Sequence, residues 1–260
     1  MASEAKAGEP VVNWRDNGAW GLFTILWAFL TVPLTVIAIL LAAPFMGPRH
    51  AFFTIGPWWA RQMFRVAGIA LEVRGWQSLP EAIRTGEQPV IFMSNHESQL
   101  DPPLLVGAIP VPAVYIAKKE VKLIPFVGWA AMCAGVIFID RSQREKAVRS
   151  LHEAALKIRG GRNVVIFPEG TRTRTGALLP FKKGGFSLAM DAGVPIVPLA
   201  TVGGYQTLPP GALRIRPGRY IVNFGDPVDP GAFPQRDALM AEVRNQIVAL
   251  REEAMAVQPS

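Results

Sequence analysis

Residues 18–48 carry no charged side chain, and this stretch restricts how the chain can fold more than any other feature. It is 31 residues long and rich in Leu, Ile, Val, Phe and Trp. As one helix it would measure roughly 46 Å at about 1.5 Å per residue, which exceeds the ~30 Å hydrocarbon core of a bilayer. Pro33 lies near its middle, where proline can break a helix. The sequence leaves open a single tilted span and a hairpin, broken at Pro33, that dips into one leaflet.

A cleaved signal peptide is the alternative interpretation of this stretch. Signal peptides have a basic start and an apolar region of only ~7–15 residues. Here the apolar stretch is longer, and Glu4, Glu9 and Asp16 precede it. The sequence therefore favours a retained membrane anchor.

A second segment, residues 51–70, mixes tryptophan and phenylalanine with Arg61 and Arg65. This combination is typical of the lipid headgroup zone. Arginines are frequent after the apolar stretch and scarce before it, which predicts that the bulk of the chain lies on the cytoplasmic side of the cell membrane. We expect a tail at 1–17, an anchoring helical segment at 18–70 and a catalytic domain at 71–260.

Composition limits the remaining possibilities. A chain of 260 residues has room for one sizeable α/β domain and an accessory segment. One cysteine excludes an internal disulfide, and three histidines without ligand spacing predict no metal and no cofactor. The net charge of +7 is scattered along the chain, so an anionic membrane surface, a phosphate-bearing substrate or an acidic protein explains it better than nucleic acid.

From residue 69 onward, strand-like and helix-like patterns alternate. This alternation predicts an α/β fold with a mostly parallel or mixed sheet of about seven strands and covering helices. Helices are expected at 142–159, which ends at Gly160-Gly161, and at about 235–255. The expected strands are residues 69–73, 90–93, 111–116, 136–139, 163–167, 195–199 and 220–224.

Three polar clusters follow predicted strands. They are His96 with Asp101, Asp140 with Arg141, and residues 168–172. Ligand sites in open parallel sheets form at the carboxyl ends of the strands. We therefore expect the three clusters to converge on one crevice.

The first cluster suits general-base chemistry. Asp101 precedes Pro102, a residue favoured at the first helical position, so Asp101 is expected at the helix cap and His96 on the turn before it. Across that bend the carboxylate can accept a hydrogen bond from one ring nitrogen and raise the basicity of the other. An N-capping aspartate beside an ordinary surface histidine is the simpler alternative.

The other two clusters suit anion binding. Arg141 and Arg172 can grip a phosphate through paired N–H groups, and Gly170 beside Glu169 allows the backbone to approach a ligand. We also expect four lysines to add positive charge at the same end of the sheet: Lys118, Lys119, Lys182 and Lys183. Their individual roles are less defined.

At this point the chain resembles the lysophosphatidic acid acyltransferase family, the 1-acyl-sn-glycerol-3-phosphate O-acyltransferases. The resemblance covers roughly residues 73–224 and rests on four blocks in the family's order: Asn95-His96 with four residues before Asp101, Gly135-Val136-Ile137-Phe138-Ile139-Asp140-Arg141, Phe167-Pro168-Glu169-Gly170-Thr171-Arg172, and Val194-Pro195-Ile196-Val197-Pro198-Leu199. The third of these blocks, residues 167–172, is called the third motif. Thr173 follows it at a position where serine is frequent in the family.

The resemblance implies a glycerolphosphate acyltransferase-like fold, a hydrophobic amino-terminal anchor and a role in phospholipid synthesis. It implies that His96 is the base, that Asp101 orients it, and that an acyl thioester is attacked directly by the sn-2 hydroxyl of 1-acylglycerol 3-phosphate. The acceptor's glycerol phosphate would be held by Arg141, Glu169, Gly170, Thr171 and Arg172. Acyl-CoA or acyl carrier protein would be the donor, and phosphatidic acid the product.

Three alternatives remain at this stage. A related enzyme could acylate another lysolipid, such as lyso-ornithine lipid. An esterase is suggested by Gly185-Phe186-Ser187-Leu188-Ala189, which resembles the turn that carries a nucleophilic serine. In the lipase and esterase fold the catalytic histidine follows that serine along the chain, whereas every histidine here precedes Ser187. A non-enzymatic lipid-binding membrane protein would need the anchor and the positive charge but not the His-Asp pair.

Overall fold

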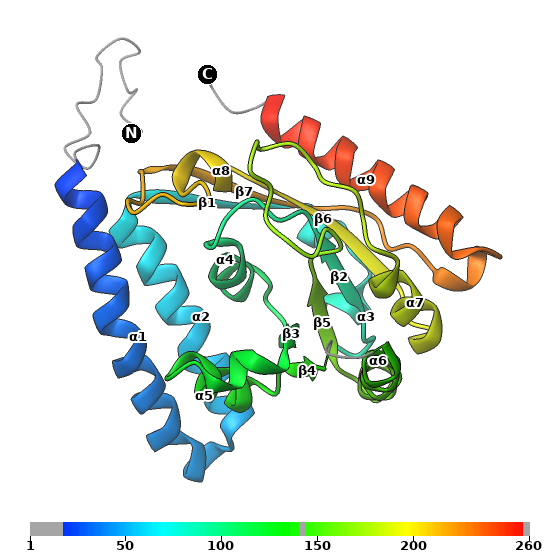
Figure 1. The fold of residues 1–260 in the computed structure, drawn as a ribbon, viewed down its shortest axis with the longest axis horizontal. Coiled ribbons are helices and arrows are strands. Elements are labelled where there is room, and N and C mark those ends of the chain that lie inside the picture. Colours follow the sequence, from blue (N-terminus) through cyan, green and yellow to red (C-terminus); the bar gives the residue numbers. More distant parts are fainter. Residues whose placement is uncertain (1–17, 141–143, 257–260) are drawn as a thin grey trace, which may run out of the picture.

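The computed structural model describes residues 18–140 and 144–256, which form a seven-stranded sheet with helices on both faces (Figure 1). All seven predicted strands are present, with ends displaced by a few residues. The strands are β1 Ile69–Arg74, β2 Ile91–Ser94, β3 Ala113–Lys118, β4 Ile137–Ile139, β5 Asn163–Ile166, β6 Ile196–Val202 and β7 Gly218–Phe224.

The strand order is β1-β7-β6-β2-β5-β3-β4. Every neighbouring pair is parallel except β6 with β7, which is antiparallel. The predicted α/β class with a mixed sheet is confirmed. The antiparallel pair matters for the site, because it brings the beginning of β7 to the sheet edge where β2, β5 and β6 end.

The central strand β2 is buried on both faces, as its continuous apolar run predicts. Phe92 packs into one core cluster with Phe64 of α2 and Leu104 of α4. Ile91 and Met93 point the opposite way, into a second cluster with side chains of α6, α7 and α9. The strand and the turn that follows it are therefore held from both sides.

Helices form the outer layers. Helices α2 and α4 cover one face of the sheet, and α6, α7 and α9 cover the other. The predicted helix at 142–159 begins, in the described part, at residue 144, and the one at 235–255 is present. The helices are α1 Gly18–Met46, α2 Pro48–Ala67, α3 Glu81–Arg84, α4 Asp101–Ala108, α5 Val127–Ala134, α6 Arg144–Arg159, α7 Lys183–Ala192, α8 Gly204–Thr207 and α9 Arg236–Ala256, with short 3-10 turns η2 Trp76–Ser78, η3 Lys119–Leu123 and η4 Pro230–Ala232.

The apolar stretch forms one unbroken helix, α1, so the possible break at Pro33 does not occur. A hairpin exists nevertheless, because the chain reverses at Gly47, whose φ of 84° suits glycine, and returns as α2. The two helices lie side by side (Figure 1), and the Trp59 indole N–H donates to the Thr31 hydroxyl oxygen at 2.9 Å. Contacts with α2 stabilise α1 as one continuous helix, although Pro33 disfavours it.

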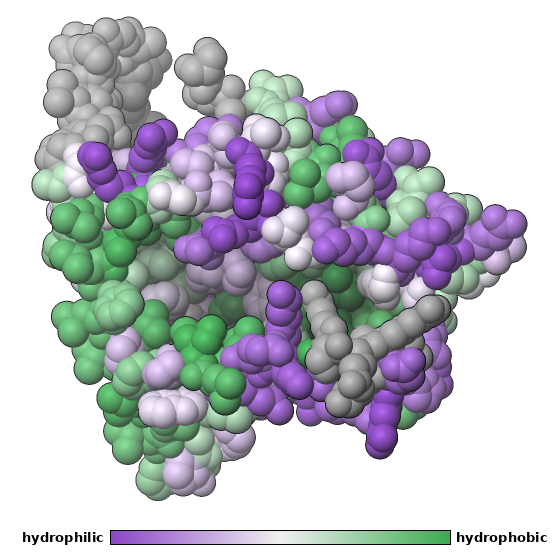
Figure 2. Space-filling view, in the orientation of Figure 1, coloured by the Kyte–Doolittle hydropathy of each residue, from purple (hydrophilic) through white to green (hydrophobic). Residues whose placement is uncertain are grey.

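The outer face of α1 is apolar and exposed. Leu26, Phe29 and Leu30 are 60%, 81% and 66% exposed, and Leu123 in η3 is 82% exposed. Figure 2 shows this hydrophobic surface gathered over α1 and around α5. By length and composition, α1 is the one described helix that is suited to cross a membrane. Such an apolar area on a folded surface marks contact with a membrane or a partner.

Candidate active site

The turn between β2 and α4 carries the candidate catalytic residues. It leaves the carboxyl end of the central strand, where the following segments of β5 and β6 also emerge. Asn95 fixes the start of the turn: its side-chain amide exchanges hydrogen bonds with the backbone of Thr201 on β6, at 2.7 and 2.8 Å. His96 therefore begins from a rigid position.

His96 and Asp101 are in contact. Nδ1 of His96 lies 2.6 Å from Oδ2 of Asp101, whose side chain is fully buried. The same oxygen accepts the backbone N–H groups of Glu97, at 2.7 Å, and Ser98, at 2.8 Å. A carboxylate surrounded by donors acts only as an acceptor, so the Nδ1 proton belongs to the histidine and Nε2 is left as the basic nitrogen.

The predicted capping role of Asp101 is wrong. Helix α4 begins at Asp101 itself, and Leu100 occupies the N-cap position without a side-chain cap. The carboxylate turns back toward His96, since its two oxygens are taken by the turn's N–H groups, by the imidazole and by a tyrosine. The residue that looked like a cap orients the base instead.

That tyrosine, Tyr220, was not predicted as a site residue. Its hydroxyl donates to Oδ1 of Asp101. Burial, together with the charge of Asp101, holds the pKa of Tyr220 well above its usual range, so it remains a donor. Tyr220 reaches the site because β7 runs antiparallel to β6, and in the sequence it looked only like the start of an apolar strand.

The His96 ring is held flat against Phe167. Their centroids lie 4.0 Å apart with an interplanar angle of 15°, and the Tyr115 ring is also stacked with Phe167. The His96 side chain is 16% exposed, and no described residue forms a hydrogen bond with Nε2. The basic nitrogen is therefore accessible while the ring has one orientation.

Glu169 clamps the backbone of the same turn. Its Oε1 accepts the His96 N–H at 2.6 Å, and its Oε2 accepts the Leu179 N–H at 2.7 Å. Burial raises the pKa of the Glu169 carboxyl, and these two N–H groups oppose that rise. Because Thr173 also donates its N–H to the His96 carbonyl at 2.9 Å, the third motif and the base form one connected unit.

The other residues predicted to bind phosphate differ in their exposure and in their contacts. Gly170 adopts a φ of 69°, which suits glycine, and Thr171 is exposed. Arg172 is partly exposed and has neither a hydrogen bond nor an ion pair among the described residues, and it adjoins the Thr173 contact to His96. Arg141 lies outside the described residues.

The four predicted lysines fall into two groups. Lys119 pairs with Asp140 at 2.9 Å, and Lys183 pairs with Asp237 at 3.2 Å. Lys118 is exposed at the end of β3. Lys182 is exposed beside Gly170, and a Cβ atom built onto Gly170 would lie 2.9 Å from the Nζ of Lys182. Lys182 is thus the lysine that lies against the third motif.

Two more residues that the sequence did not single out lie behind the turn. Glu97 is almost fully buried, and Arg251 of α9 pairs with it at 3.2 Å. Glu97 was visible as an acidic residue between His96 and Asp101. Arg251 is 154 positions from Glu97 and gives no local signal.

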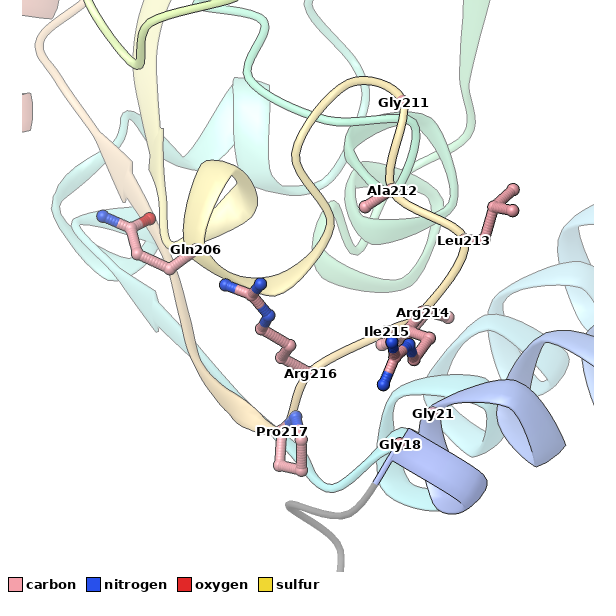
Figure 3. Close-up of a pocket in the computed structure, with 10 residues that line it drawn as sticks. All are labelled: Gly18, Gly21, Gln206, Gly211, Ala212, Leu213, Arg214, Ile215, Arg216 and Pro217. Carbon is pink, nitrogen blue, oxygen red and sulfur yellow. The ribbon is translucent and has the colours of Figure 1, made fainter.

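Cavities lie on several sides of the structure. One of about 370 Å³ adjoins Phe167 and is lined by Gly170, Lys182 and apolar side chains of β3, β4, β5, α6 and α7. An apolar cavity of about 120 Å³ lies among α1, α2, α4 and α5. A third, of about 800 Å³, lies between the start of α1 and residues 206–217 and contains none of the predicted site residues (Figure 3).

The serine that suggested an esterase has no histidine partner among the described residues. Ser187 lies on α7, and its hydroxyl accepts a hydrogen bond from Arg236 at 3.1 Å. Neither His96 nor His152 contacts it: the first pairs with Asp101 and the second with Asp191.

Within residues 18–140 and 144–256, no group of three or more His, Cys, Asp or Glu is arranged to hold a metal ion.

Comparison with known proteins gives a consistent result. The family model described as Acyltransferase matches residues 70–202. A 1-acyl-sn-glycerol-3-phosphate acyltransferase alpha of Mus musculus is 36% identical over 191 residues, and that alignment covers 72% of this chain and 65% of the relative. A 1-acyl-sn-glycerol-3-phosphate acyltransferase of Limnanthes douglasii is 32% identical over 220 residues, covering 80% of this chain and 73% of the relative.

A solved structure has the same fold. The crystal structure of the 1-acyl-sn-glycerophosphate acyltransferase of Thermotoga maritima superposes with a TM-score of 0.80 at 27% identity. The match covers 92% of this chain and 98% of that one. The likeness therefore extends over the α1–α2 hairpin as well as the sheet.

Proposed function

The chain belongs to the acyltransferase family, and from that premise we propose that it transfers a fatty acyl group from an acyl thioester to the sn-2 hydroxyl of 1-acylglycerol 3-phosphate. The product is phosphatidic acid, and the role is in phospholipid synthesis. The observation that carries the proposal is the 2.6 Å contact between His96 Nδ1 and the buried Asp101 carboxylate, which leaves Nε2 open.

The reaction needs one positioned base. Nε2 of His96 takes the proton of the sn-2 hydroxyl as the hydroxyl oxygen attacks the thioester carbonyl carbon, and Asp101 stabilises the imidazolium that forms. When the tetrahedral intermediate collapses, the C–S bond breaks and the departing thiolate receives the proton from His96. Backbone N–H groups near the turn are the candidates for stabilising the oxyanion. This step needs no covalent acyl-enzyme.

Acceptor recognition is assigned to the third motif and its neighbours. Arg172, which is unpaired among the described residues, and Arg141 bind the phosphate through their guanidinium groups. Gly170 and Thr171 bring backbone and hydroxyl groups close to the glycerol. Glu169 acts chiefly by holding His96, because both its oxygens already accept backbone N–H groups. Lys118, Lys119, Lys182 and Lys183 supply supporting positive charge.

The anchor places the site beside its lipid substrate. Residues 18–70 attach the protein to the cell membrane through the exposed face of α1, and residues 71–260 form the catalytic domain on the cytoplasmic side. The apolar cavity among α1, α2, α4 and α5 borders Pro103, close to Asp101 at the start of α4. This cavity is a suitable entrance for an acyl chain that comes from the bilayer.

The donor and the acceptor are identified by one experiment. Purified protein in vesicles is given a panel of lysolipids that includes lysophosphatidic acid and lyso-ornithine lipid, each with acyl-CoA or acyl carrier protein, and products are identified by mass. Phosphatidic acid formed only from lysophosphatidic acid supports the proposal. Preferential acylation of another lysolipid would identify that lipid as the acceptor in place of lysophosphatidic acid. Thioester hydrolysis without any diacyl product would contradict acyl transfer.

A further inference from the structure

Behind the catalytic pair lies a buried ion pair that the reaction above does not use. Glu97 is the residue after His96, and its side chain is 4% exposed. Its partner, Arg251, comes from α9 (Figure 1), and its side chain is 19% exposed. We propose that Arg251 is a positioning residue for acyl transfer, acting through Glu97 on the turn that holds His96 and Asp101. The inference rests on the proposed function.

The contacts of Glu97 tie two helices to the turn. Its Oε1 accepts the Nε–H of Arg251 at 3.2 Å and an amide N–H of Asn95 at 3.4 Å. Its Oε2 accepts the backbone N–H of Tyr205, in α8, at 3.3 Å. One carboxylate thus joins α9, α8 and the beginning of the turn.

The backbone of Glu97 is one of the donors that hold Asp101. Its N–H lies 2.7 Å from Oδ2 of Asp101, the same oxygen that contacts His96. Because one residue makes both sets of contacts, a shift of Glu97 as a whole moves a donor of the orienting carboxylate. A displacement of about 1 Å at a reacting group is enough to lower a rate by ~10².

Arg251 holds a second segment as well. Besides its contact with Glu97, its guanidinium donates to the carbonyl of Gly176. Gly176 lies between Thr173, which donates to the His96 carbonyl, and Leu179, which donates to Glu169. A single side chain of α9 thus fixes both the base's own turn and the loop that clamps it.

The charged form of Glu97 destabilises the folded chain because the carboxyl is buried. A purely structural role therefore predicts a different pH dependence of stability than a role in catalysis. Burial raises the pKa of the Glu97 carboxyl to about 7, the nearby charge of Asp101 adds to the rise, and Arg251 opposes it. Between pH 4.5 and about 7 the folded chain keeps a proton that the unfolded chain has lost. Stability from this group is therefore present at low pH and decreases as pH rises through that window.

Burial sets the sign of this shift, and the charged groups that face Glu97 act on it in opposite directions. Arg251 of α9 favours the charged form, and Asp101 of α4 disfavours it. The contacts from Tyr205 and Asn95 are uncharged N–H donors. At neutral and higher pH the carboxylate form, which pairs with Arg251, is the one expected to hold the turn.

The test uses three variants of the full chain in vesicles. We expect Arg251→Met to lower kcat by roughly ten- to a hundredfold with the KM for the lysolipid unchanged, and Arg251→Lys to recover part of the loss. Glu97→Gln should also lower kcat. Its melting temperature relative to wild type should nevertheless rise between pH 5 and pH 8, because it lacks the carboxyl that must ionise. Should Arg251→Met fail to fold, the other two variants carry the test.

Glu252→Gln is the matched control, because Glu252 is an exposed neighbour on α9, and wild-type kcat is expected for it. The inference is overturned if Arg251→Met keeps wild-type kcat, if it raises KM alone, or if Glu97→Gln lowers stability and kcat in parallel at every pH. Failure of the proposed function looks different: wild-type protein would then form no diacyl product, and His96→Ala would change nothing.

Discussion

At the scale of single residues, the site is organised around one buried carboxylate. Asp101 accepts from His96, from two N–H groups of its own turn and from Tyr220. The sequence predicted the His96–Asp101 contact, because both residues lie on one short segment. It could not predict Tyr220, which is 119 positions from Asp101, since no local pattern shows which side chain a distant strand delivers.

Tyr220→Phe tests the importance of that contact. The change leaves Oδ1 of a buried carboxylate without its hydroxyl donor, which costs about 1–3 kcal/mol of unfolding free energy. Thermal unfolding in detergent measures the loss. Tyr205→Phe is the control, because the Tyr205 hydroxyl donates to the Arg174 carbonyl at an exposed position. Equal melting temperatures for the two variants would contradict the account.

Arg172→Gln tests phosphate binding. The variant loses a charged donor, so we expect the KM for lysophosphatidic acid to rise by roughly ten- to a hundredfold, in line with ~1.5–3 kcal/mol for a hydrogen bond to a charged group. The kcat at saturation should change less. Arg174→Gln, two positions along at an exposed site, is the control, and an unchanged KM for Arg172→Gln would remove the role assigned to Arg172.

At the scale of elements, periodicity located the strands and longer helices but not their arrangement. The seven strands follow from apolar runs that end at polar turns, whereas the antiparallel pairing of β6 with β7 depends on contacts between distant segments. Pro33 was a plausible break by local rules. The contacts between α1 and α2 outweigh that preference, and the reversal occurs at Gly47.

The exposed face of α1 leads to an element-scale prediction. Leu30→Asp should weaken attachment to vesicles by roughly a hundredfold, since an aspartate within the apolar region costs about 2.5–3.5 kcal/mol. The fold should survive, because Leu30 is 66% exposed. Flotation with vesicles measures the bound fraction.

Leu156→Asp is the matched control for that experiment. Leu156 is 51% exposed on α6, on the side of the sheet opposite α2. Its replacement should leave attachment unchanged. Comparable losses for both variants would show that α1 has no special part in attachment.

At the scale of the whole molecule, the same architecture serves the lipid and the chemistry. The α1–α2 hairpin packs against α4 through α2 and against α5 through both of its helices, and α4 begins with Asp101. The apolar surface is therefore linked to the catalytic turn through one helix layer. The excess of positive charge, +7 over the chain, favours an anionic membrane surface and anionic substrates.

The measurement that tests the central claim most directly is the turnover of His96→Ala in vesicles, followed as diacyl product by mass. We expect kcat to fall by at least ~10², with melting temperature and vesicle attachment close to those of the wild type. Turnover at the wild-type rate would contradict the assignment of His96 as the base that takes the proton from the lysolipid hydroxyl.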